Sequence, residues 1–319
     1  MRLLFLGSGA FGLPTLEHLY AYHELLAVIT QPDKPAGRKR IMTPTPVGQW
    51  AAARGLPTFK EDDVNTPEFV QQVRDLKPDA AVVIAFGQKL STALIDALGE
   101  LAVNLHSSLL PKYRGAAPIN WAMINGDPET GVSVIALAQR MDAGQIYAMD
   151  RIAIEPSETA GELHDRLASL GPAAISKVLD DLRQCTLAPL PQDDAQATKA
   201  PKLKKSDGTV DFNQPAEVVR ARIHGLTPWP GCKIHWLRED QPTETLTLIR
   251  VESDLKPAPG SPPPGTILED QRVACQPGTI RLLELQRPGK RAMTLQEFTA
   301  GHPLVPGQRF VPIRPQTSN

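Results

Sequence analysis

An asparagine and a histidine two positions apart are the residues best suited to chemistry in this sequence. Asn104 and His106 stand at the end of an apolar run over 101–105. Because side chains alternate along a strand, both face the same side of the predicted sheet. An amide can donate to a developing oxyanion, and an imidazole exchanges protons near neutral pH, which are two needs of acyl transfer to an amine. Spacing alone leaves open the alternative that His106 is a hydrogen-bonded structural residue.

A carboxylate is needed to orient or charge the histidine. Asp142 lies in the segment Arg140-Met141-Asp142-Ala143-Gly144, which we expect to be a turn between strands over 132–137 and 146–154. Polar side chains at strand ends meet at one edge of an open α/β sheet, where ligands bind. We therefore predict Asn104, His106 and Asp142 as a catalytic set.

A glycine-rich turn offers a competing hypothesis. Gly7, Gly9 and Gly12 follow an apolar run and match a G-x-G-x-x-G dinucleotide motif. Such a site needs an acidic residue at the end of the next strand, but that strand ends at Thr30, and Asp33 lies beyond a proline. We therefore expect the glycines to serve a tight strand-to-helix turn, with Gly9 at a positive φ.

The elements that must position these residues alternate between strand and helix. Short apolar runs over 3–6, 25–30, 80–86 and 101–105 alternate with helical segments such as 13–22. This order predicts an α/β fold with a Rossmann-like, mostly parallel sheet. Leucines and other aliphatic residues then recur at helical spacing from Leu163 to Leu182, across Gly171-Pro172, and predict two consecutive helices.

The C-terminal part has a different character. Residues 189–206 carry prolines and lysines without periodicity and are predicted to be a basic linker. A helix over 215–224 and five short strands (234–236, 246–251, 266–268, 273–275 and 280–285) then predict a small OB-like β-barrel. The predicted domains are 1–188, 189–206 and 207–319.

Composition narrows the class of protein. The 319 residues carry a formal net charge of −1, so any nucleic-acid partner must be met by local basic patches. The three cysteines are scattered along the chain, which favours a reduced, cytoplasmic protein, and no His or Cys pair has metal-ligand spacing. No apolar run approaches the roughly 18 residues of a membrane span. We expect a monomer that needs neither membrane nor metal.

An ordered set of motifs resembles a known family. Asn104-x-His106-x-Ser108-Leu109-Leu110-Pro111, the run 113–118, Asn125-Gly126, Thr130-Gly131 and Met141-Asp142-x-Gly144 are similar to the 10-formyltetrahydrofolate-dependent formyltransferases. The resemblance implies that 10-formyltetrahydrofolate is the co-substrate and that Asn104, His106 and Asp142 are catalytic. It also implies that Ser108, Leu109, Leu110 and Pro111 lie against the folate.

Further segments resemble the branch of that family that formylates initiator methionyl-tRNA. The run 31–46 looks like that branch's insertion loop, although Lys39 replaces an expected glycine, and Ser107 is also an unusual residue at its position. The runs 200–203, 228–231 and 289–293 resemble its linker and C-terminal domain. The resemblance and the clustered charge imply tRNA contacts by these cations: Lys34, Arg38, Lys39, Arg40, Lys202, Lys204, Lys205, Lys290 and Arg291.

Three alternatives remain at this stage. The chain could formylate another amine, such as that of an amino-sugar nucleotide. It could be a nicotinamide-dependent oxidoreductase built on the glycine motif. It could also be a non-catalytic RNA-binding protein that uses the basic loop, linker and barrel. Without the resemblance, solvated basic segments that bind no ligand would be the simplest explanation of the charged loop.

Overall fold

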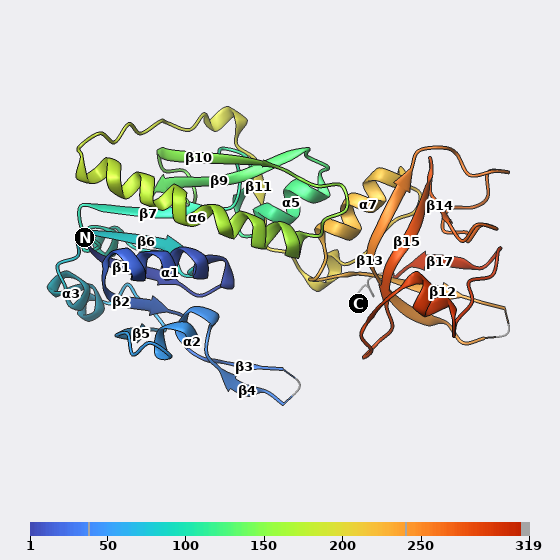
Figure 1. The fold of residues 1–319 in the computed structure, drawn as a ribbon, viewed down its shortest axis with the longest axis horizontal. Coiled ribbons are helices and arrows are strands. Elements are labelled where there is room, and N and C mark those ends of the chain that lie inside the picture. Colours follow the sequence, from blue (N-terminus) through green and yellow to red (C-terminus); the bar gives the residue numbers. More distant parts are fainter. Residues whose placement is uncertain (38, 240, 314–319) are drawn as a thin grey trace, which may run out of the picture. The chain divides into compact units, whose positions relative to one another are not determined.

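The chain folds into two compact units. The computed structural model describes residues 1–37, 39–239 and 241–313. Unit 1 comprises 1–115, 131–152 and 164–199, and unit 2 comprises 116–130, 153–163 and the chain from Ala200 onward (Figure 1). The chain passes from one unit to the other several times, so each unit is built from non-contiguous parts of the sequence.

Unit 1 is built on one seven-stranded sheet with the order β10-β9-β7-β6-β1-β2-β5. The strands are β1 (Arg2–Gly7), β2 (Glu24–Thr30), β5 (Thr58–Lys60), β6 (Ala80–Ile84), β7 (Leu101–His106), β9 (Glu129–Ala136) and β10 (Ile146–Ala153). The pairs β1–β2, β1–β6, β2–β5 and β6–β7 are parallel, whereas β9 runs antiparallel to β7. The predicted mostly parallel sheet is confirmed.

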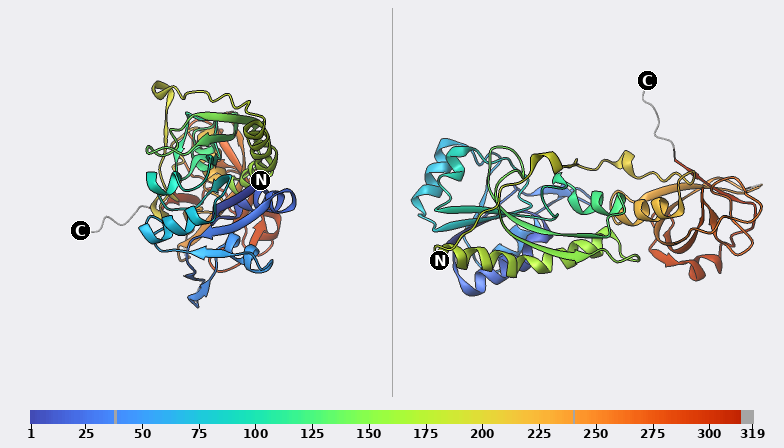
Figure 2. Two further views of the ribbon diagram at one scale, coloured as in Figure 1. Left: turned by 90° about the vertical axis from the view of Figure 1, so that its left-hand side faces the viewer. Right: turned by 90° about the horizontal axis from the view of Figure 1, so that it is seen from above.

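Helices cover both faces of this sheet. Helices α1 (Leu13–Tyr22) and α6 (Ala160–Arg183) lie on one face, and α3 (Pro67–Asp75) and α4 (Thr92–Ile95) lie on the other (Figures 1 and 2). The central strand β6 is buried over its whole length because helices pack against both of its sides. Helix α2 (Pro46–Ala52) and the short helix η1 (Ala10–Gly12) complete the unit.

The prediction of two helices across Gly171-Pro172 is wrong, because α6 is one continuous helix of 24 residues. A proline inside a helix removes one backbone hydrogen bond. Here the buried side chains on both sides of it, including Leu167 and Ile175, hold the helix together by packing. Gly171 permits that packing, since a Cβ would stand 2.3 Å from Thr15 Oγ1.

The glycine turn also differs from the expectation. Gly9 has φ −78°, so the predicted positive φ is wrong. A Cβ on Gly9 would meet only the Ala85 Cβ at 3.4 Å, an ordinary contact. Gly7 is the constrained position, because a Cβ there would stand 2.6 Å from a ring carbon of Phe5 and 2.9 Å from the Ile84 carbonyl oxygen.

The basic loop after β2 is a two-stranded hairpin. Strands β3 (Lys34–Ala36) and β4 (Ile41–Thr43) pair antiparallel, with Lys34 opposite Thr43, and all six residues are exposed. Thr45 follows the hairpin and caps α2 by accepting a hydrogen bond from Gly48 N. Arg38 lies outside the described residues.

Unit 2 contains an antiparallel, nearly closed barrel, as predicted. Its strands are β12 (Cys232–Leu237), β13 (Glu244–Asp254), β14 (Val273–Ala274), β15 (Thr279–Gln286), β16 (Ala292–Thr294) and β17 (Arg309–Pro312). The order is β14-β15-β13-β12-β17, and β16 pairs with β15. The predicted strand over 266–268 consists only of single bridges, Thr266 to Arg309 and Ile267 to Val273, which link the two ends of the sheet.

Three helices accompany the barrel: α5 (Pro118–Ile124), α7 (Ala216–Gly225) and α8 (Leu295–Thr299). Pro215 is the N-cap of α7 rather than its first residue. The core of unit 2 centres on Trp236, Phe298 and Phe310, all fully buried. Of the remaining short elements, β8 (Arg114–Gly115) pairs with β11 (Lys199–Ala200), while η2 (Asp194–Gln196) and η3 (Lys205–Asp207) lie in the predicted linker.

Candidate active site

Asn104 and His106 lie at the carboxyl end of β7, on the less buried face of the strand. In the register with the antiparallel neighbour, Asn104 pairs with Ile135 and His106 with Ser133. His106 is only 6% exposed. Among the described residues, none forms a hydrogen bond with the Asn104 side chain, so its amide is available to a substrate.

Both ring nitrogens of His106 face acceptors. The Nε2 atom lies 2.9 Å from the backbone oxygen of Tyr113. Because a carbonyl oxygen can only accept, Nε2 carries the ring proton in this arrangement. The Nδ1 atom lies 3.7 Å from Asp142 Oδ1, so that a second proton on the ring would complete an ion pair with the carboxylate. The structure thus brings together the predicted pair His106 and Asp142.

Asp142 is held in place by the backbone of its own turn and of β8. Its φ is +54°, and its Oδ2 accepts a hydrogen bond of 2.8 Å from Gly115 N. The turn returns the chain so tightly that a Cβ on Gly144 would stand 1.8 Å from the carbonyl oxygen of Ala136. Only glycine fits at that close approach, which explains the glycine in the Met141-Asp142-x-Gly144 motif.

A second layer of polar residues supports the Asp142 turn, and sequence reasoning missed it. The Gln192 amide donates to the backbone oxygens of Asp142 and Gly144 at 2.8 and 2.7 Å. Arg114 in turn donates to Gln192 Oε1 through Nε and an Nη atom at 3.0 and 2.7 Å. Arg114 belongs to the motif over 113–118, which was a usable signal, but nothing in the linker-like sequence around Gln192 indicated a role.

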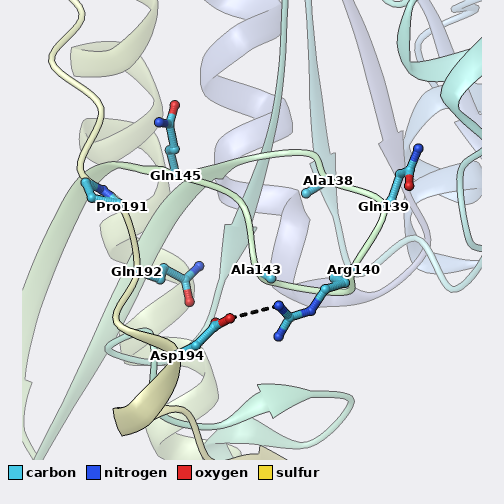
Figure 3. Close-up of a pocket in the computed structure, with 8 residues that line it drawn as sticks. All are labelled: Ala138, Gln139, Arg140, Ala143, Gln145, Pro191, Gln192 and Asp194. Atoms are coloured by element: carbon cyan, nitrogen blue, oxygen red, sulfur yellow. Dashed lines mark hydrogen bonds and ion pairs between the residues drawn. The ribbon is translucent and has the colours of Figure 1, made fainter.

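Asp194 joins two arginines beside this layer. It pairs with Arg114 at 2.8 Å. It also pairs with Arg140 at 2.8 Å, the ion pair marked in Figure 3. Hydrogen bonds from Arg140 and Arg114 hold the pKa of the Asp194 carboxyl below its usual range. Since Arg140 precedes Asp142 by two residues, this pairing connects the segment over 191–194 to the turn that carries the Asp142 carboxylate.

The four residues expected to lie against the folate have two different environments. Ser108 and Leu110 are buried, the first with its hydroxyl donating to Lys112 O at 2.7 Å and the second in a cluster with Ile135 and Ile146. Leu109 and Pro111 are partly exposed. Ser108 and Leu110 therefore fix the shape of the segment, and the folate contact of the four remains a prediction.

A cavity of about 380 Å³ adjoins the Asp142 turn. It is lined by Ala138, Gln139, Arg140, Ala143, Gln145, Pro191, Gln192 and Asp194 (Figure 3). Its volume is within the range of small-molecule sites. Asn104, His106 and Asp142 are not among the residues that line it, so the cavity borders the Asp142 turn without including the predicted catalytic set.

The nicotinamide hypothesis finds no suitable residue at the end of β2. Thr30 is fully buried there and hydrogen-bonds Thr45 at 2.6 Å. The Asp33 carboxylate pairs with Lys60 Nζ at 2.6 Å. Ser8, within the glycine motif, donates to Phe86 O and accepts from Gln31 N, so it serves to close the turn.

The predicted cations are divided between the two units. Lys34, Lys39 and Arg40 are exposed on the β3–β4 hairpin of unit 1, with Lys34 Nζ donating to Gln31 at 3.2 Å. Lys202, Lys204, Lys205, Lys290 and Arg291 are exposed on unit 2. Arg291 is engaged by Glu297 at 2.6 Å. The position of Arg38 is outside the described residues.

The described part of the chain contains no cluster of three or more His, Cys, Asp or Glu residues that could hold a metal ion. None of its helices combines the length and the apolar character required to cross a membrane.

Comparison with known proteins assigns both parts of the sequence. The family described as formyl transferase matches residues 1–179, and the family described as formyl transferase, C-terminal domain, matches residues 202–303. A methionyl-tRNA formyltransferase of Moorella thermoacetica is 42% identical over 313 residues, which cover 97% of this chain and 98% of that protein. The methionyl-tRNA formyltransferase of Geobacter metallireducens is 39% identical over 315 residues, covering 97% and 98%.

Solved structures share the fold at low sequence identity. The sugar 3N-formyl transferase WlaRD, solved with dTDP and 5-N-formyl-THF, superposes with a TM-score of 0.65 at 14% identity and covers 91% of this chain and 99% of that one. HypX from Aquifex aeolicus, in complex with tetrahydrofolic acid, gives a TM-score of 0.58 at 16% identity, covering 94% and 47%.

Proposed function

This chain belongs to the formyl transferase family, and we propose that it transfers the formyl group of 10-formyltetrahydrofolate to the α-amino group of initiator methionyl-tRNA. The observation that carries the proposal is similarity over the whole chain, at 42% identity and 97% coverage, to a protein named for that reaction. The product is N-formylmethionyl-tRNA, the form used to initiate translation.

The reaction exchanges one bond to the formyl carbon for another. When bound, 10-formyltetrahydrofolate supplies a formyl group on a nitrogen that can leave. The methionyl amine attacks the formyl carbon, a new C–N bond forms, the bond to the carrier nitrogen breaks, and one proton passes from the amine to the departing carrier. The protein must therefore stabilise negative charge on the formyl oxygen and manage a proton.

Asn104 meets the first requirement. Its side-chain amide is free of partners among the described residues and stands at the carboxyl end of a strand, where ligands bind in open α/β sheets. We assign it the role of donor to the formyl oxygen as negative charge develops there. A fixed neutral donor of this kind stabilises an oxyanion without reorganisation of solvent.

His106 and Asp142 meet the second requirement. The contact of Nε2 with Tyr113 O orients the ring, and the Asp142 carboxylate lies 3.7 Å from Nδ1, so a doubly protonated ring is balanced by a neighbouring negative charge. In our proposal the charged ring stabilises the oxyanion and takes part in the proton transfer. Asp142 contributes by charge and orientation, and Ser108, Leu109, Leu110 and Pro111 shape the place of the folate.

Binding of tRNA is proposed to involve both units. The exposed cations Lys34, Lys39 and Arg40, with Arg38 beside them in sequence, stand on a hairpin suited to contact phosphates. Lys202, Lys204, Lys205, Lys290 and Arg291 supply the cations of unit 2. In sequence we place the chemistry in 1–188, a basic connection in 189–206 and RNA binding in 207–319, and we propose a monomeric, cytoplasmic enzyme.

The proposal is tested by offering alternative acceptors. Purified protein with 10-formyltetrahydrofolate is incubated with methionyl-tRNA, with uncharged tRNA and with an amino-sugar nucleotide, and each product is identified by mass. We expect formylation of methionyl-tRNA alone. Preferred formylation of the sugar amine would replace the proposed acceptor, and transfer to neither amine would refute the reaction.

A further inference from the structure

Among the described residues of unit 2, Trp229 is the large aromatic side chain with substantial exposure to solvent. Trp229 is 49% exposed, whereas Trp236 in the same unit is fully buried. Trp229 lies in the turn between α7 and β12, with Pro228 and Pro230 on either side. A single exposed apolar residue needs no explanation by itself, so the surroundings of Trp229 decide whether it has a role.

The turn that presents Trp229 is firmly held. The Thr227 hydroxyl donates to Ile223 O at 2.8 Å, and Gly231 N donates to Leu226 O at 2.8 Å. Proline rings fix the backbone φ of the residues before and after the tryptophan. The indole is therefore carried on an ordered turn whose conformation costs little entropy to maintain during binding.

A lysine-rich segment packs directly against this turn. Lys233 N donates to Gly208 O at 3.1 Å, and Arg222 donates to Asp207 O at 2.6 Å. Gly208 approaches the turn so closely that a Cβ on it would stand 2.4 Å from Gly231 O and 3.5 Å from Pro230 Cβ. The segment over 202–208 thus ends in direct contact with the tryptophan turn.

The lysines of this segment project from an anchored backbone. Leu203 is 4% exposed in the core of unit 2, and Trp121 Nε1 donates to Pro201 O at 2.8 Å. Lys202, Lys204, Lys205 and Lys233 are exposed. Within the described ranges, none of their ammonium groups forms an ion pair. In its described part, unit 2 therefore carries four exposed lysines without ion pairs on the segment and strand that adjoin the turn of the exposed indole.

We propose that Trp229, Lys202, Lys204, Lys205 and Lys233, here called the Trp229 platform, bind the unpaired nucleotides at the 3′ end of the aminoacylated tRNA. Single-stranded nucleic acids are bound by aromatic side chains that stack with bases, interleaved with cations that hold phosphates. A base stacks with the Trp229 indole, and the lysines contact the flanking phosphates. The inference rests on the proposed function, since it assumes an RNA substrate.

The unpaired end is the favoured occupant for a chemical reason. In a duplex the bases stack with each other and leave no face for an indole, whereas unpaired bases can be splayed onto one. The lysine segment also follows closely in sequence on a residue that is bonded near His106. Thr198 accepts a hydrogen bond of 2.8 Å from Tyr113 N, and the Tyr113 carbonyl contacts His106. Lys202 follows Thr198 by four residues.

Steady-state formylation by full-length variants tests the role of the indole. Trp229→Ala is expected to raise KM for methionyl-tRNA roughly 5- to 100-fold, the loss associated with one stacked base, and to lower kcat much less. Trp229→Phe retains a stacking face and is expected to recover most of the affinity. The dependence of KM on salt should keep its slope in Trp229→Ala and become shallower in Lys204→Ala, because only the lysine contacts a phosphate.

Fluorescence tests the contact itself. A single-stranded RNA ending in CCA is titrated into the wild-type protein, Trp229→Phe and the control Trp50→Phe, which changes a partly exposed tryptophan of α2. We expect quenching in the wild type and in Trp50→Phe and none in Trp229→Phe. A blunt RNA hairpin without unpaired nucleotides should quench weakly in all three proteins.

The outcomes separate the two proposals. An unchanged KM in Trp229→Ala, or quenching that persists in Trp229→Phe, overturns the platform while leaving formyl transfer intact. An equal loss in Trp229→Ala and Trp229→Phe also overturns it, because the residue would then act through packing rather than stacking. If the wild type does not formylate methionyl-tRNA, the proposed function fails before any variant is compared.

Discussion

Two buried histidines, one in each unit, have opposite environments. His106 is 6% exposed and lies between an acceptor carbonyl and the Asp142 carboxylate. His224 is 1% exposed, and its Nε2 accepts a hydrogen bond of 3.0 Å from Val251 N. Burial, with Arg220 and Arg250 nearby, lowers the pKa of His224 to about 4. The comparison teaches that burial alone does not distinguish the histidine proposed for catalysis from the other one, whereas the charge of the neighbouring side chains does.

The largest effect should appear when each of the two histidines is replaced in turn and the rate of formyl transfer is measured. His106→Asn is expected to lower the rate of formyl transfer by roughly 10²–10⁴, through loss of charge stabilisation and proton transfer. His224→Gln is expected to leave the rate per folded molecule unchanged. Single-turnover kinetics with circular dichroism as a folding control measures both. Near-full activity in folded His106→Asn would contradict the assignment.

The support of the Asp142 turn should have the next largest effect. Gln192→Ala removes the donors to the backbone oxygens of Asp142 and Gly144. A small displacement of a catalytic group costs roughly 10- to 100-fold in rate. We expect this loss in kcat, with KM for methionyl-tRNA nearly constant. A change confined to KM would show that Gln192 contacts the tRNA rather than positioning Asp142.

The structural histidine should be visible in stability rather than in rate. Its pKa is about 4 in the folded protein and 6.5 for an ordinary histidine, so between these values the unfolded chain binds more protons. The contribution of His224 is therefore complete above pH 6.5 and is lost as pH falls to 4, by about 3 kcal/mol.

Denaturant unfolding across this pH range measures that loss. His224→Gln keeps an acceptor for Val251 N but does not titrate, so its stability should be flatter with pH than that of the wild type. Identical pH profiles for the two proteins would mean that His224 is not held neutral by the fold.

The smallest effect should be that of Gly9→Ala. Gly9 has a negative φ, and the added methyl group meets only Ala85 Cβ at 3.4 Å. We expect activity and melting temperature close to those of the wild type. Gly144→Ala is the contrasting variant, because its Cβ would overlap with Ala136 O, and it should lose stability and activity. Severe loss in Gly9→Ala would revive a ligand role for the glycine motif.

Local patterns in the sequence predicted much of the fold. Apolar runs identified the central strands β1, β2, β6 and β7, because parallel strands are buried on both faces. The helix break at Gly171-Pro172 was wrong because local propensity opposed a helix that tertiary packing against Thr15 and Leu105 stabilises. The positive φ at Gly9 was wrong for a related reason, since a motif does not specify which of its glycines is constrained.

The candidate site shows the same limit. Asn104 and His106 were predicted from their types and strand positions and Asp142 from its turn, and the family resemblance implied the same set. Gln192 and Asp194 support the Asp142 turn from a segment without periodicity, which for Gln192 lies 50 residues further along the chain. Lys202, Lys204 and Lys205 were read as part of a linker, and the structure shows an anchored backbone because Leu203 is buried in the core of unit 2.

The most direct test of the account is a double-mutant cycle between His106 and Asp142 in single-turnover formylation of methionyl-tRNA. The variants are His106→Asn, Asp142→Asn and the double mutant, each checked for folding and tRNA binding. If the two groups act as one unit, each single change is expected to cost roughly 10²–10⁴ in rate, and the double mutant should be little slower than the slower single mutant. Losses that multiply in the double mutant would show that the residues act independently and would contradict the proposed pairing.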